Sequence, residues 1–156
     1  IRDVLVELDP ANADVYAANA EAYLGELAGL HHDIQTLLDA IPPDRRSIVT
    51  NHLAFNYFSE RYGLQLVGVI IPGGSTTSEP SVQEVLTLIE TVQEYNVPAI
   101  FTETTVSESI AQQIAGETGA QIVQLYTGSL SQPGDGADTY LNYMRYNAQA
   151  IADALK

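Results

Sequence analysis

One histidine lies where a predicted strand passes directly into a predicted helix. The β-branched run Ser47–Thr50 favours a buried strand, and an aromatic-rich helical pattern extends from His52 to Tyr62. Ligands of open α/β folds bind outside the carboxyl ends of parallel strands, so an imidazole at this junction is a candidate ligand. A purely structural histidine is the alternative that this position leaves open.

Three other predicted strands end in residues that belong to the same edge of a parallel sheet. The strand ends are followed by Pro72–Gly74, Glu103–Thr105 and Thr127–Ser129. With His52, these segments supply one imidazole, one carboxylate and several hydroxyls, a set that suits a hard or borderline cation. The set does not suit phosphate, because the glycine spacing and the lysine of a P-loop are missing. One histidine and one glutamate are too few for a closed zinc site, which has about four ligands.

The remaining histidines, His31 and His32, are adjacent on a predicted helix. Neighbouring helical side chains point about 100° apart, so the two do not form a natural chelating pair. We expect them to be solvated or to cap the helix. An enzyme that uses His52 as a base and Glu103 to orient it is the competing function. It is not favoured, because the strand ends carry neither a nucleophile elbow nor a cofactor fingerprint.

A long helix and a regular alternation of strands and helices position these residues. An N-capping Asp9 followed by Pro10 predicts a helix of about 30 residues, ~45 Å long, that ends at Ile41. Later strands are predicted near 47–50, 65–71, 98–102 and 121–126, and later helices near 52–62, 81–95, 107–118 and 138–155. This pattern predicts an α/β fold, with a long N-terminal helix before a parallel four-stranded sheet that has helices on both faces. We divide the chain into residues 1–43 and 44–156.

Composition and charge exclude several classes of function. The formal net charge is −14, and no Lys or Arg occurs between Arg61 and Arg145. Such a surface attracts cations and argues against nucleic acid. The absence of cysteine excludes disulfides and thiolate metal sites, and no apolar run reaches the roughly 18 residues of a membrane span. Because the chain begins at Ile1, inside an apparent helix, we expect it to be a piece of a longer protein.

Four stretches resemble one known family in content and in order. The segment Thr50–Leu64 is similar to a motif of the metal-binding components of zinc and manganese ABC importers. The other three stretches are Val97–Glu103, Ala115–Ala120 and Ala137–Asn147. The resemblance covers nearly the whole chain. It implies the C-terminal metal-binding lobe of a two-lobed solute-binding protein in residues 44–156, preceded in residues 1–43 by the end of the N-terminal lobe and the interlobe helix.

The resemblance also assigns roles to residues. His52 matches the third metal ligand of the family, where histidine is mostly associated with zinc and glutamate with manganese. Glu103 matches a carboxylate near the site that usually contacts a ligand rather than the metal. Gly128 stands where the family usually has a fourth, carboxylate ligand.

The glycine at position 128 leaves four arrangements open. Three histidines and a water can complete the site, or Glu103 can move onto the metal. A loop carboxylate, Asp135 or Asp138, can reach in, or the cargo is not a simple divalent cation. We favour the first two arrangements.

The family resemblance implies a binding protein that catalyses nothing. Such a protein would capture a divalent metal ion outside the cytoplasm and deliver it to a membrane ABC permease. The resemblance favours Zn²⁺ over Mn²⁺ as this ion, and it implies a location in the periplasm or a lipid anchor at the cell surface. We expect a monomer that is not an integral membrane protein, with its export signal and remaining ligands upstream. The alternative is an adhesin-like or degenerate relative that no longer binds metal, with Gly128 as the trace of that loss.

Overall fold

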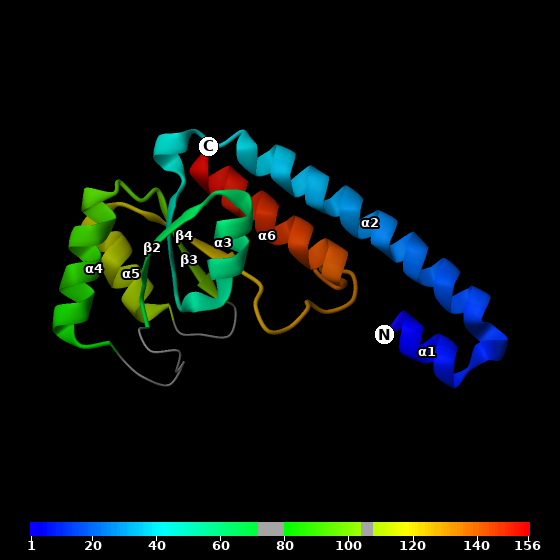
Figure 1. Cartoon of the computed structure of the whole chain (residues 1–156). Coiled ribbons are helices and arrows are strands. Elements are labelled where there is room, and N and C mark those ends of the chain that lie inside the picture. Colours follow the sequence, from blue (N-terminus) through cyan, green and yellow to red (C-terminus); the bar gives the residue numbers. More distant parts are fainter. Residues whose placement is uncertain (72–79, 104–107) are drawn as a thin grey trace.

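A parallel sheet of four strands forms the centre of the protein (Figure 1). The computed structural model describes residues 1–71, 80–103 and 108–156. The strands are β1 (Ser47–Thr50), β2 (Gln65–Val69), β3 (Ala99–Glu103) and β4 (Gln121–Leu125), in the spatial order β2-β1-β3-β4. Each neighbouring pair is parallel, so each strand requires a crossover to the next. The predicted α/β fold with a parallel four-stranded sheet is therefore confirmed.

Helices cover both faces of this sheet. They are α1 (Arg2–Leu8), α2 (Ala13–Asp39), α3 (Asn56–Tyr62), α4 (Val82–Glu94), α5 (Ser109–Thr118) and α6 (Tyr140–Leu155), with short 3₁₀ turns at Pro10–Asn12, Pro43–Arg45 and Leu53–Phe55. Alternate residues of a strand point to opposite faces. Phe101 of β3 packs in the core formed with α2, α3 and α6, whereas its neighbour Ile100 packs in the core formed with α4 and α5.

Only the C-terminal half of the long helix α2 belongs to the core. Its 27 residues span about 40 Å. Leu30, Ile34 and Leu38, in its C-terminal half, are buried in the core that includes α6. The N-terminal half extends away from the sheet, and α1 lies beside that distant end (Figure 1). None of the described helices is long and apolar enough to cross a membrane.

Several helix boundaries differ from the prediction by a few residues. The helix predicted from His52 begins at Asn56, after a 3₁₀ turn, because His52 itself is extended, with φ −147° and ψ −177°. Asp9 does not cap the backbone of α2. Its carboxylate instead accepts hydrogen bonds from the side chains of Asn12 (2.7 Å) and Tyr16 (2.8 Å), which lower the pKa of Asp9. The predicted loop residues 72–79 and 104–106, and the predicted helix start at residue 107, lie outside the described residues.

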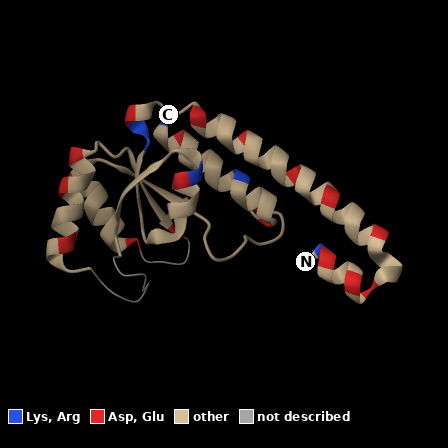
Figure 2. Ribbon diagram, in the orientation of Figure 1, with Lys and Arg blue, Asp and Glu red and all other residues tan. Residues whose placement is uncertain are grey.

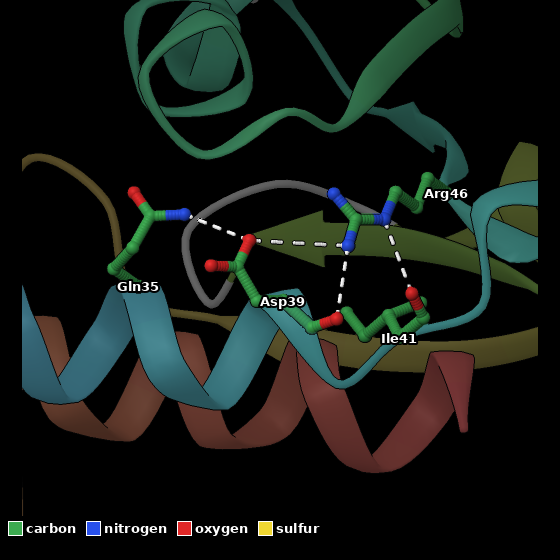
Figure 3. A network of polar contacts seen from close by, with 4 residues as sticks. All are labelled: Gln35, Asp39, Ile41 and Arg46. Atoms are coloured by element: carbon green, nitrogen blue, oxygen red, sulfur yellow. Dashed lines mark hydrogen bonds and ion pairs between the residues drawn. The ribbon is translucent and has the colours of Figure 1, made fainter.

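Arg46 ties the C-terminal end of α2 to the start of β1 (Figure 3). Its Nε donates to the carbonyl of Ile41 and its Nη2 to the carbonyl of Asp39, each at 3.1 Å. The Asp39 carboxylate also accepts from Gln35 at 2.8 Å. The last carbonyls of a helix have no intrahelical partner, so the guanidinium satisfies groups that would otherwise be unpaired.

We expect Arg46→Ala to lower the free energy of unfolding by about 1–2 kcal/mol, because the two carbonyls lose a charged donor. Urea denaturation followed by circular dichroism measures the change. Arg2→Ala is the matched control. Arg2 is half exposed and, among the described residues, pairs only with the neighbouring Asp3, so its loss should change stability by less than about 0.5 kcal/mol. Equal stability of the Arg46 variant and the wild type would contradict the capping role.

Candidate metal centre

The sheet brings His52 and Glu103 to the same level at the carboxyl ends of neighbouring strands. In the β1–β3 pair, Thr50 lies opposite Phe101. His52 and Glu103 each follow these partners by two residues, so they share both the level and the side of the sheet. This is the edge at which open parallel sheets bind ligands. The prediction that these strand ends meet at one edge is confirmed for β1 and β3.

The two side chains are in direct contact. Nδ1 of His52 faces Oε1 of Glu103, and both atoms are buried. Neither atom has another hydrogen-bond partner among the described residues, so each compensates the burial of the other. The carboxylate is 5% exposed and the imidazole 24%. Within the described part of the chain, Nε2 of His52 has no hydrogen-bond partner, and a neutral imidazole with Nδ1–H keeps its lone pair on Nε2.

The backbone around His52 is held by several hydrogen bonds. The His52 carbonyl accepts from the hydroxyl of Thr50 and from the N–H of Ala54, each at 2.8 Å. The N–H groups of Ile70 and Ile71 continue the pairing with β2 by donating to the carbonyls of Thr50 and Asn51. The imidazole therefore projects from a fixed strand end, which is the kind of support that a preorganised ligand requires.

Thr127 and Tyr143 also surround Glu103. The sequence placed Thr127 among the hydroxyls of this edge but did not predict its contact with Glu103, and it gave Tyr143 no role. The buried hydroxyl of Thr127 donates to Oε2 of Glu103. Burial raises the pKa of the Tyr143 phenol, and the nearby Tyr140 and the negative charge of Glu103 raise it further. The only signal for Thr127 in the sequence is its place just after β4. Tyr143 lies on α6, and its distance from β3 in the sequence hides their proximity.

No further carboxylate of the described residues joins the pair in a group that could hold a metal ion. Both oxygens of Asp138 are engaged locally, Oδ1 by the side chain of Asn142 at 3.0 Å and Oδ2 by the N–H of Gly134 at 2.9 Å. These bonds lower the pKa of Asp138, with Asn142 the larger contribution. Asp135 is exposed. Among residues 1–71, 80–103 and 108–156, no group of three or more His, Asp or Glu side chains could hold a metal ion.

Gly128 follows Thr127 in the left-handed conformation, with φ +69°. It is exposed, and a Cβ atom placed on it would have no neighbour within 4 Å. Position 128, next to Thr127, therefore has space for a larger side chain, and glycine provides none there.

His31 is neither free in solvent nor a helix cap, in contrast to the prediction. Its Nδ1 lies 3.1 Å from the hydroxyl of Tyr62, and its Nε2 lies 3.2 Å from Nη2 of Arg61. It thus links α2 to α3. His32 is exposed, as predicted.

Comparison with solved structures identifies the class of protein to which this fold belongs. The manganese-bound periplasmic metal-binding protein of Candidatus Liberibacter asiaticus has a TM-score of 0.85 and 31% sequence identity, over 99% of this chain and 57% of that one. The fold is therefore that of the periplasmic metal-binding proteins. Residues 1–154 match the family described as zinc-uptake complex component A, periplasmic, and the chain belongs to this family.

Curated relatives differ in the metal for which they are named. The manganese-binding lipoprotein MntA of Halalkalibacterium halodurans is 36% identical over 156 residues, which are 99% of this chain and 51% of that protein. The iron-binding protein YfeA of Yersinia pestis is 35% identical over 153 residues, which are 97% of this chain and 49% of that protein. The chain spans about half the length of these relatives.

Proposed function

We propose that this chain is the C-terminal lobe, with the connecting helix, of a substrate-binding protein that captures a divalent transition metal ion outside the cytoplasm. The ion is passed to the membrane permease of an ABC importer, and no reaction is catalysed. Residues 1–43 contain the end of the upstream lobe and the linking helix, and residues 44–156 form the metal-binding lobe. Membership of the zinc-uptake family supports this assignment.

The contact between His52 and Glu103 is the observation that carries the proposal. Glu103 engages Nδ1 and leaves Nε2 available on a side chain that is partly exposed. Metal-bound histidines in proteins almost always donate their other N–H to a carboxylate, a carbonyl or water. A neutral imidazole backed by a buried carboxylate at a ligand-binding edge is thus an appropriate metal ligand.

The cargo is a divalent metal, and we favour Zn²⁺ over Mn²⁺. Imidazole nitrogen suits zinc, whereas manganese prefers carboxylate and carbonyl oxygens. His52 therefore supports zinc, while the manganese and iron names of the relatives support a broader choice. The acidic surface aids capture of either cation, because Asp and Glu are spread over α1, α2 and α4 and basic residues are few (Figure 2).

Metal analysis of the full-length protein tests the proposed function. Protein purified without chelator should contain close to one equivalent of transition metal, and chelator-treated protein should regain one equivalent of Zn²⁺ in a calorimetric titration. Competition between Zn²⁺ and Mn²⁺ then ranks the two. Failure to bind either ion stoichiometrically would favour the alternative, a relative that has lost its metal site.

We expect Gly128→Asp to tighten Mn²⁺ binding in the full-length protein by about tenfold or more, and to favour Mn²⁺ relative to Zn²⁺, because it adds an oxygen ligand beside the pair. The side chain has room, and Asp tolerates a positive φ better than most residues. Calorimetric titration measures both affinities.

Gly134→Asp is the matched control for this substitution. Gly134 is also exposed, has φ +92° and would place its Cβ in open space. The Gly134→Asp substitution adds the same negative charge away from the His52–Glu103 pair, and it should leave the affinities for Zn²⁺ and Mn²⁺ unchanged. An equal gain in both variants would show a general charge effect and contradict the placement of position 128 at the metal.

A further inference from the structure

A single hydroxyl extends the His52–Glu103 pair to a third strand. Thr127 follows β4, is buried, and donates from Oγ1 to Oε2 of Glu103. The other oxygen of the same carboxylate faces Nδ1 of His52. A continuous chain of polar contacts therefore joins the carboxyl ends of β4, β3 and β1.

The direction of these contacts follows from the chemistry of the groups. A carboxylate can only accept hydrogen bonds, so Thr127 and His52 both donate to Glu103. His52 must then carry a proton on Nδ1, and in the neutral ring the lone pair is on Nε2. A histidine binds metal through such a lone pair. The contacts thus select which nitrogen of His52 is available.

Two anchors restrict the carboxylate more than one does. The terminal torsion of a glutamate side chain is broad, so a carboxylate held only by the imidazole keeps rotational freedom. The geometry points to Thr127 as a positioning residue of the metal site, whose hydroxyl orients Glu103 and, through it, the imidazole of His52. This inference rests on the proposed function, in which His52 binds the metal.

The backbone before Thr127 is itself fixed. The side chain of Asn147, on α6, accepts from the N–H of Tyr126 at 3.0 Å and donates to its carbonyl at 2.9 Å. Asn147 is 1% exposed, so both bonds are shielded from water. The Thr127 carbonyl also accepts from the N–H of Ser129 at 2.8 Å. A hydroxyl on such a rigid support can hold a carboxylate in one orientation.

The test compares Thr127→Val with Thr127→Ser in the full-length protein. Valine keeps the shape and removes the donor, whereas serine keeps the donor. Nitrogen-15 NMR of the metal-free protein reports the tautomer of His52, and competition with a chromophoric chelator measures Zn²⁺ affinity. We expect the wild type and the serine variant to hold the Nδ1–H tautomer. The valine variant should show a mixture of tautomers and bind Zn²⁺ about tenfold more weakly, as is usual when a group behind a metal ligand is lost.

Thr102→Val is the matched control. Thr102 is a fully buried threonine of β3, and it donates to Glu108 at 2.9 Å instead of to Glu103. Its loss should leave both the tautomer and the affinity unchanged. Thr127 would not be a positioning residue if the valine variant matched the wild type in both measurements, or if the serine variant were as impaired as the valine variant. A tautomer that changes with valine in a protein that binds no Zn²⁺ would support the positioning role and overturn the metal-capture proposal alone.

Discussion

Replacing His52 by alanine in the full-length protein is expected to weaken Zn²⁺ binding by about 100-fold. A structural zinc site with four ligands is worth about 10–16 kcal/mol, or roughly 3 kcal/mol for each ligand, and 1.4 kcal/mol corresponds to a factor of ten in affinity. The loss should be large because His52 is the only histidine beside a buried carboxylate in the described residues. Competition with a chelator of known affinity measures it.

The alanine variant also leaves Oε1 of Glu103 buried without a partner, which costs stability as well as affinity. His52→Asn separates the two effects, because its Nδ2 amide, attached to Cγ as Nδ1 is in histidine, can still donate to Glu103 but does not replace the imidazole lone pair. It should remain as stable as the wild type and still bind Zn²⁺ weakly. His32→Ala removes an exposed histidine of α2 and is the control for histidine number. Unchanged affinity in both His52 variants would reject His52 as a ligand.

Local signals explain why most of the fold could be predicted. The capping box of Ser81 and Glu84 is present at the start of α4, and Gly119 ends α5 in the left-handed conformation, with φ +77°. Each signal depends on residues three or four apart, so the sequence displays it directly. The first residue of α3 was harder to predict from the sequence. The apolar pattern after His52 is the same for a 3₁₀ turn and an α-helix, and only the structure separates the two.

The candidate site depends on strand order and register, which local sequence does not display. The sequence indicated that His52 and Glu103 share an edge, because both follow predicted strands. Their contact additionally requires that β1 and β3 be neighbours and that Thr50 pair with Phe101. The contact between Thr127 and Glu103 was missed for the same reason. A threonine is an ordinary residue at a strand end, and its hydroxyl gains a role only when β4 is placed beside β3.

The second large effect is expected when residues 1–156 alone are compared with the full-length protein. Among the described residues, no group of three or more His, Asp or Glu side chains could hold a metal ion, and Glu103 of the His52–Glu103 pair is already engaged by Thr127. We propose that the remaining ligands come from an upstream lobe. Loss of at least two ligands at roughly 3 kcal/mol each predicts an affinity for Zn²⁺ about four orders of magnitude below that of the full-length protein.

Calorimetry and thermal melting with and without Zn²⁺ provide the comparison, because a ligand that binds only the folded state raises the melting temperature. The full-length protein should be stabilised by one equivalent of Zn²⁺, whereas the fragment should melt at nearly the same temperature with and without it. The fragment 1–156 that carries His52→Ala is the control for weak, nonspecific binding of Zn²⁺ to the acidic surface. At micromolar Zn²⁺, this variant fragment should take up as little of the ion as the unsubstituted fragment does. Tight, stoichiometric binding by residues 1–156 alone would refute a site divided between two lobes, because a single lobe would then contain ligands that the described residues do not bring together.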